Sequence, residues 1–250
     1  MDKSMSLPEA ASVVVIGGGV MGCSVLYHLA KMGVKDVVLL ERKQLTCGTT
    51  WHSAAQVRQL RSSNNMTELI KYSTELYAGL EAETGQSTGW IKTGSLVLAT
   101  NEDRFTFIKR QASLAKLFNV ETHIIDQSEA AEMWPMMNAD DVVGAIYSPD
   151  DGRVNPSDLC VALIKGAKAN GARVFEDSEV TGFDIENGRV AAVRTEHGDI
   201  KCEKVVNCAG LWGRRIGEMA GVTVPLYACE HFYLLTKAIK GMGAHLPTLA

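Results

Sequence analysis

The chain has 250 residues, of which 46% are hydrophobic and 22% charged, so its composition is that of a folded globular protein. Disordered, collagenous and coiled-coil chains are excluded. The 25 Lys and Arg residues against 29 Asp and Glu give a net charge of −4, and no basic run is long enough to follow a nucleic acid backbone. The longest apolar runs, residues 13–16 and 37–40, are the size of strands, so neither nucleic acid binding nor a membrane span is expected.

The cysteines and the first residues indicate where the protein works. No two cysteines have the C-x-x-C spacing of a metal or thioredoxin site, so we expect no metal and a reducing compartment. Residues 1–11 show neither a secretory signal nor a transit peptide, which favours the cytoplasm. The six cysteines are Cys23, Cys47, Cys160, Cys202, Cys208 and Cys229.

The first forty residues predict a βαβ unit. An apolar strand over 13–16 is followed by three glycines, a helix over about 20–32 that Gly33 ends, and a second apolar strand over 37–40. Strands that are apolar on both faces are typical of a parallel sheet covered by helices on each side. The sequence therefore predicts an α/β fold with an open, mostly parallel sheet.

The next hundred residues alternate between helix and strand. Residues 42–65 form a polar stretch too long for a routine connection, which is either a disordered insertion or a functional loop. A helix over 66–80, a strand pair around 90–100 and a helix around 105–115 follow. This part of the chain is typical of an α+β domain.

The last hundred residues return to the first sheet. Asn155 and Pro156 begin a helix over 157–170, and a strand over 173–176 follows. Residues 179–203 alternate as a three-stranded meander with two Xaa-Gly turns, and a separate apolar strand at Val205 and Val206 enters a small-residue turn. A helix to about Gly221 and an alternating strand over 226–236 complete the prediction.

A dinucleotide fingerprint lies in the first unit. Gly17, Gly19 and Gly22 form G-x-G-x-x-G between strand and helix, where glycines permit a tight turn, close approach of a pyrophosphate and close helix packing. Glu41 ends the second strand, and its carboxylate suits ribose hydroxyls while repelling a 2′-phosphate. The alternative is a purely structural glycine turn. The context favours NAD or FAD over NADP.

The later segments separate FAD from NAD. A small meander followed by a strand that ends in Cys208, Ala209 and Gly210 resembles the two-dinucleotide-binding flavoproteins of the D-amino-acid oxidase superfamily. The stretches 48–54, 88–91, 134–138, 149–152 and 205–212 resemble the sarcosine and dimethylglycine dehydrogenase family. The resemblance implies FAD, with Arg42 and Val180 among its contacts.

Two histidines acquire roles from this resemblance. In that family the histidine of the loop at 48–54 is joined covalently to the flavin 8α carbon, and His52 stands at the matching position. Eleven residues beyond Glu41 can span up to ~36 Å, which permits that reach without proving it. His231 matches a histidine that faces the substrate amine, where a neutral imidazole would hold the amine unprotonated. The alternatives are a solvated loop histidine and a strand histidine bonded to a backbone carbonyl.

The resemblance also implies a domain plan. Residues 12–84 and 151–222 would form a discontinuous FAD-binding domain, and residues 85–150 and 223–250 an interleaved substrate domain. Family members continue with a closing segment of the substrate domain and usually a folate-binding region. Because residues 247–250 stop just after a predicted strand, we expect this chain to be a fragment or a truncated protein.

The implied activity is oxidative demethylation of sarcosine or dimethylglycine, by hydride transfer from the N-methyl group to FAD. Electron-transfer flavoprotein or oxygen would accept the electrons, and tetrahydrofolate would take part only if a C-terminal region exists. The location is cytoplasmic, or the mitochondrial matrix in a eukaryote. Two alternatives stay open. One is a deaminating amino-acid oxidase with non-covalent FAD, and the other is a cofactor-binding fragment without turnover.

Overall fold

The computed structural model describes residues 6–250 and divides them into two compact units. Unit 1 comprises residues 6–53, 80–88 and 156–231, and unit 2 comprises residues 54–79, 89–155 and 232–250. The chain therefore passes repeatedly from one unit to the other.

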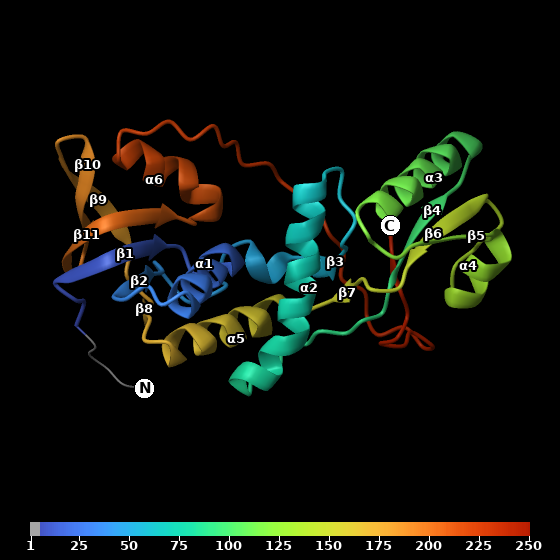
Figure 1. Ribbon diagram of the computed structural model, residues 1–250, viewed down its shortest axis with the longest axis horizontal. Helices are drawn as coiled ribbons and strands as arrows, with labels where there is room; N and C mark the ends of the chain where they lie inside the picture. Colours follow the sequence, from blue (N-terminus) through green and yellow to red (C-terminus); the bar gives the residue numbers. More distant parts are fainter. Residues whose placement is uncertain (1–5) are drawn as a thin grey trace. The chain divides into compact units, whose positions relative to one another are not determined.

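The elements of unit 1 are named here and labelled in Figure 1. They are β1 (Ala10–Ile16), α1 (Val20–Lys31), β2 (Val37–Leu40), the 3-10 helix η1 (Thr50–His52), α5 (Pro156–Ala169), β8 (Arg173–Phe175), β9 (Val180–Glu186), β10 (Arg189–Thr195), β11 (Gly198–Asn207), the 3-10 helix η2 (Gly210–Trp212) and α6 (Gly213–Met219).

Unit 1 is built on a six-stranded sheet with the order β8-β2-β1-β11-β10-β9. The first four strands are parallel and the last two antiparallel. Val14 and Ile16 point to the face that meets α6, while Val13 and Val15 are buried on the other face, against α1. Helices α1 and α5 pack against each other. The predicted α/β fold with its parallel core is confirmed.

One boundary in the meander differs from the prediction. The apolar pair Val205 and Val206 is not a separate strand, because β11 runs unbroken from the hairpin to the end of the sheet. Its first residues pair antiparallel with β10, and its later residues pair parallel with β1. The charged residues Glu203 and Lys204 lie on exposed positions within this continuous strand.

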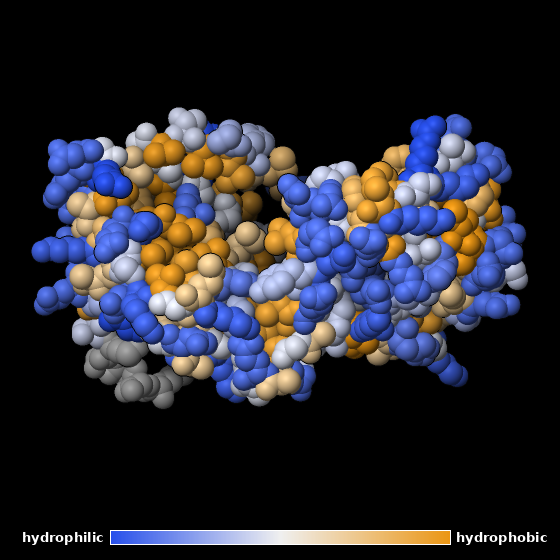
Figure 2. All heavy atoms as spheres, in the orientation of Figure 1, coloured by the Kyte–Doolittle hydropathy of each residue, from blue (hydrophilic) through white to orange (hydrophobic). Residues whose placement is uncertain are grey.

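The predicted strand over residues 226–236 is wrong. The structure has neither helix nor strand there, and Tyr227, Phe232 and Leu234 are 84%, 87% and 85% exposed. Alternation predicts which way side chains point once a neighbouring strand supplies hydrogen bonds, and no described strand pairs with this segment. Apolar surface also shows over the region of α6 that precedes it (Figure 2).

Unit 2 contains a second, four-stranded sheet with the order β12-β4-β6-β5. Leu96 and Ala145 belong to the core cluster on the α4 face, and Ala99 and Ile146 to the cluster on the α3 face. A two-stranded ribbon, β3 with β7, lies in the same unit. The elements of unit 2 are β3 (Gln56–Val57), β4 (Ser95–Ala99), α3 (Glu102–Leu117), β5 (His123–Ile125), α4 (Gln127–Met133), β6 (Gly144–Ser148), β7 (Gly152–Arg153) and β12 (Thr248–Leu249).

Helix α2 (Asn64–Thr84) has residues in both units. Its 21 residues would be long enough to cross a bilayer at 1.5 Å per residue. Its sequence is too polar for that, with charged residues such as Glu68, Lys71 and Glu75 on successive turns. Among residues 6–250, no helix combines sufficient length with sufficient apolar character to span a membrane.

Candidate dinucleotide-binding site

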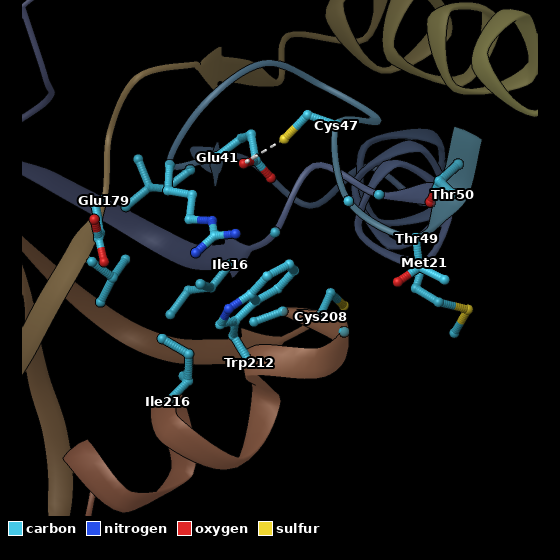
Figure 3. A pocket seen from close by; sticks show the side chains of 18 of the residues that line it. Ile16, Met21, Glu41, Cys47, Thr49, Thr50, Glu179, Cys208, Trp212 and Ile216 are labelled. Atoms are coloured by element: carbon cyan, nitrogen blue, oxygen red, sulfur yellow. Dashed lines mark hydrogen bonds between the residues drawn. The ribbon is translucent and has the colours of Figure 1, made fainter. Parts of the chain in front are cut away.

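A cavity of about 350 Å³ lies in unit 1, where β1, β2 and β11 end and α6 begins. It falls within the size range of small-molecule sites. Its walls come from the glycine turn, the loop after β2, the start of β9 and the segment after β11 (Figure 3). Eight of the eleven residues proposed from the sequence line it, namely Gly17, Gly19, Glu41, Arg42, Val180, Cys208, Ala209 and Gly210.

The glycine turn is tight because backbone atoms fill the places where side chains would be. Gly17 has a φ of +111°, and a Cβ there would run into the carbonyl of Cys208. A Cβ on Gly22 would overlap the carbonyl oxygen of Gly17. Gly22 is therefore not part of the cavity wall but lets α1 pack directly on the turn. A Cβ on Gly19 would lie 2.9 Å from the Thr50 hydroxyl oxygen.

Glu41 is 9% exposed and holds the turn from the end of β2. Its Oε2 accepts a hydrogen bond from the Gly18 amide at 2.7 Å, and its Oε1 accepts one from the Lys43 amide at 3.0 Å. The Cys47 thiol lies 3.7 Å from Oε1, as the dashed line in Figure 3 shows. Oε1 thus receives two donors, whereas Oε2 accepts the Gly18 amide alone among the described contacts, so the second lone pair of Oε2 leaves acceptor capacity for a ligand hydroxyl.

The end of β11 forms the opposite wall. The Cys208 amide donates to the Ile16 carbonyl at 2.8 Å, which joins this strand end to the glycine turn. The Asn207 side chain fixes the turn that follows by accepting from the Ala209 amide at 3.2 Å and donating to the Gly213 carbonyl at 2.7 Å. Burial raises the pKa of the Cys208 thiol above its ordinary value, so the group is neutral at this wall.

Several lining residues were missed by the sequence analysis. The Trp212 ring lies 3.7 Å from the Arg42 guanidinium, in a cation–π contact between η2 and the loop after β2. Ile216 and Met219 project from α6 into the same cavity. The sequence contained part of this signal, since Trp212 follows the small-residue turn, but a tryptophan there is equally typical of a core.

The loop after β2 reaches the start of α1. The Thr50 hydroxyl oxygen accepts a hydrogen bond from the Val20 amide at 3.0 Å, so a side chain from thirty residues away caps this helix. Gly19, at the N-cap position, cannot do so itself. The α1 N-terminus has no acidic residue in its first turn and presents the positive end of its dipole toward the cavity.

His52 lies on this loop but not in the cavity wall. It is exposed on η1, although Thr50 and Ser53 on either side of it do line the cavity. Its Nδ1 lies 3.2 Å from the Gly48 carbonyl oxygen, and the Trp51 ring contacts the imidazole with centroids 3.7 Å apart and the ring planes tilted by 35°. Because a carbonyl can only accept, this contact is a hydrogen bond when Nδ1 carries a proton.

His231 is not brought to the cavity either. It lies exposed in the irregular segment that replaces the predicted strand. The catalytic role proposed for it therefore has no geometric support among the contacts of unit 1, and it stays a prediction.

Together these features are those expected of a nucleotide-binding site of the Rossmann type. A glycine turn without room for side chains opens onto a helix N-terminus, an acidic residue ends the second strand, and an apolar wall faces them. Anionic phosphates suit the helix end, a ribose suits Glu41, and a flat ring system suits the apolar wall. The residues present therefore fit one end of a dinucleotide such as FAD.

Comparison with known proteins identifies the family. Residues 12–249 match the family described as FAD dependent oxidoreductase, and the chain belongs to this family. Mouse mitochondrial sarcosine dehydrogenase is 47% identical over 96% of this chain, a mouse mitochondrial pyruvate dehydrogenase phosphatase regulatory subunit 42% over 94%, and human mitochondrial dimethylglycine dehydrogenase 37% over 96%. The recognised resemblance and the flavoprotein fold are confirmed.

The structural comparison agrees with the sequence comparison. The crystal structure of L-proline dehydrogenase from P. horikoshii superimposes with a TM-score of 0.82 at 34% identity, over 86% of this chain and 57% of that one. The chain spans 27% of the length of the mouse sarcosine dehydrogenase, 27% of the regulatory subunit and 28% of the human dimethylglycine dehydrogenase. The activity of a whole protein of that size is therefore a matter for proposal.

Proposed function

We propose that this chain binds FAD in the unit 1 cavity and belongs to an enzyme that oxidises the N-methyl group of sarcosine or dimethylglycine. The observation that carries the proposal is the cavity itself, which combines the glycine turn, Glu41 and the β11 end in a member of an FAD-dependent family. FAD would supply the chemistry by accepting a hydride from the N-methyl carbon. The residues of this chain bind and orient it.

The binding roles follow from the geometry of each wall. Gly17 and Gly19 let the diphosphate approach the backbone at the α1 N-terminus, and Gly22 allows the helix to sit close enough. Glu41 accepts from ribose hydroxyls. The remaining proposed contacts border the nucleotide from the loop after β2, from β9 and from the end of β11, and they are Arg42, Val180, Cys208, Ala209 and Gly210.

We also propose that His52 carries the flavin covalently through its 8α carbon. The support is the family resemblance and the position of η1 beside two lining residues. Acid precipitation of the complete polypeptide that carries this chain should leave the yellow colour in the pellet, because a covalent bond survives unfolding. His52→Ala should release the colour to the supernatant. Colour released from the unaltered protein would contradict the assignment and favour the non-covalent oxidase.

The substrate end of the site is assigned to segments that the cavity does not include. We propose residues 12–84 and 151–222 as the FAD-binding domain and residues 85–150 and 223–250 as part of the substrate domain. His231 would hold the substrate amine unprotonated. In the complete polypeptide, His231→Gln should slow flavin reduction by sarcosine or dimethylglycine and change its dependence on pH between 6 and 9. An unaltered pH profile would return His231 to a structural role.

A second candidate function is favoured by one relative. The protein that is 42% identical to this chain is named a regulatory subunit, so a cofactor-binding protein without turnover is a real alternative. Anaerobic mixing with sarcosine or dimethylglycine distinguishes the two. The flavin of the proposed enzyme is reduced and loses the absorbance of oxidised flavin at roughly 450 nm, whereas the flavin of a non-catalytic protein keeps it.

The proposed partners follow from the same activity. They are an N-methylated amino acid, an electron acceptor such as electron-transfer flavoprotein or oxygen, and tetrahydrofolate if a folate-binding region is encoded downstream. The sarcosine and dimethylglycine dehydrogenases compared above are both named as mitochondrial proteins. We therefore propose the mitochondrial matrix for a eukaryotic source and the cytoplasm for a bacterial one.

A further inference from the structure

The loop that bears His52 is held in place by unit 1 rather than hanging free. Its residues 42–50 make hydrogen bonds to the glycine turn and the start of α1 on one side, and to the segment after β8 on the other. On one side the Thr46 amide donates to the Gly18 carbonyl at 2.9 Å, and the Leu45 side chain lies over Gly18. These contacts pack the middle of the loop against the glycine turn.

On the other side, the loop is braced by residues 176–178, which follow β8. The Ser178 amide donates to the Glu41 carbonyl at 2.8 Å, and the Asp177 amide donates to the Lys43 carbonyl at 2.9 Å. The next rung uses a side chain, because the Leu45 amide donates to Glu176 Oε1 at 2.6 Å. Glu176 therefore adds a third hydrogen bond to the two backbone bonds, and it does so at Leu45, the residue whose side chain lies over Gly18.

Residues 176–178 are themselves held by hydrogen bonds. Asp177 has a φ of +50°, a left-handed conformation that Asp adopts more readily than most non-glycine residues. The His197 ring donates from Nε2 to the Asp177 carbonyl at 2.8 Å, and the Ser178 hydroxyl donates to the Glu176 carbonyl at 3.0 Å. Glu176 is thus presented by a rigid turn, yet it is exposed and does not line the cavity.

We propose that Glu176 is a positioning residue for covalent attachment of the flavin to His52. This inference rests on the proposed covalent role of His52. By holding the Leu45 amide, Glu176 keeps the loop seated on Gly18, so that η1 and its histidine stay in register with a cofactor bound at the turn. Attachment replaces an imidazole N–H and a methyl C–H bond by one C–N bond, and the two electrons and two protons released reduce dioxygen to hydrogen peroxide. Correct placement of the imidazole limits such a step.

The test measures attachment separately from binding. Apoprotein of the complete polypeptide is mixed with FAD in air, and the acid-stable fraction of the flavin is followed with time beside the total flavin bound. An exposed hydrogen bond contributes on the order of 1 kcal/mol, which corresponds to a factor of about five. Glu176→Ala should therefore bind FAD like the unaltered protein but attach it about five-fold more slowly.

Two further variants separate positioning from general stability. Glu176→Gln retains an oxygen that can accept from the Leu45 amide, so it should restore attachment to within about two-fold. Glu203→Ala removes an exposed carboxylate of the same unit, on β11, and should leave the rate unchanged. Attachment at an unaltered rate in Glu176→Ala would overturn the proposal, and so would an equal loss in the Gln variant.

The result is distinguishable from failure of the covalent assignment itself. If the unaltered protein shows no acid-stable flavin, the role of His52 is wrong and the role of Glu176 falls with it. If the unaltered protein attaches flavin and Glu176→Ala does so at the same rate, His52 stands and only the positioning role is overturned.

Discussion

Two strand ends meet at the nucleotide cavity, and each is followed by a turn that requires glycine for a different reason. At the end of β1 the glycines are required by space, because a Cβ on Gly17 or Gly22 would enter a backbone carbonyl. At the end of β11, Gly210 has a φ of +54°, but no atom of the described chain beyond its own neighbours lies within 4 Å of where a Cβ would stand. Only its backbone conformation is therefore required. The first turn is restricted by packing, and at Gly17 also by a φ of +111°, whereas the second turn is restricted by a dihedral angle alone.

This difference predicts unequal tolerance to the same substitution. A packing restriction involves the helix and strand on either side, whereas a dihedral restriction is local and can be met by Asn or Asp as well. The variants below probe the two turns in order of decreasing effect.

Gly22→Ala should have the largest effect. The added methyl overlaps the Gly17 carbonyl, and neither group can move without shifting α1 against β1. We expect the free energy of unfolding to fall by about 3 kcal/mol, with loss of bound FAD. Denaturant unfolding and flavin content after desalting measure both. Gly79→Ala, within α2 and with open space around it, is the control and should be neutral or slightly stabilising.

Glu41→Ala should come next. It leaves the amides of Gly18 and Lys43 without their acceptor and removes the proposed partner of the ribose. A hydrogen bond to a charged group contributes about 1.5 to 3 kcal/mol, so FAD retention should fall by at least ten-fold. Glu41→Gln keeps one acceptor oxygen, so its FAD retention should lie between that of the parent and that of Glu41→Ala. Equal FAD content in all three proteins would contradict the role assigned to the fingerprint.

The first turn was also the part of the site that the sequence could predict. Gly17, Gly19, Gly22 and Glu41 have fixed spacing within one βαβ unit, so local pattern alone places them correctly. The two strands around them are buried on both faces, as continuous apolar runs indicate. Such short-range features are encoded within about thirty residues.

The features that escaped prediction depend on contacts between distant segments. Nothing in the sequence around Thr50 indicates that it caps α1, and nothing around Trp212 indicates that it stacks on Arg42. The strand predicted over 226–236 failed for the same reason, since its alternation contains no information on a pairing partner. Side-chain periodicity describes an element, whereas these contacts belong to the assembled sheet.

Gly210→Ala should have a smaller effect than either change at the first turn. No described atom obstructs the methyl, so the cost is only that of the left-handed conformation, about 1 kcal/mol. Gly210→Asn should cost less than that, because Asn adopts this conformation more readily. Thermal unfolding of both variants beside the parent tests this. A loss as large as that of Gly22→Ala would show that the second turn is also restricted by packing.

Cys208 gives the mildest probe of the second turn, because alkylation reports on it without a substitution. Burial raises the pKa of this thiol, so at any given pH it has less thiolate than an ordinary cysteine, whose pKa is about 8.5. Cys47, which is exposed beside the first turn, is the internal reference.

Between pH 7 and 9, timed iodoacetamide treatment with peptide mass analysis should label Cys47 first, and the labelling of Cys208 should rise only toward the upper end of that range. Because both residues line the cavity, added FAD should slow both reactions. Labelling of Cys208 as fast as that of Cys47 at pH 7 would contradict the burial of this thiol at the β11 wall and the raised pKa that burial causes.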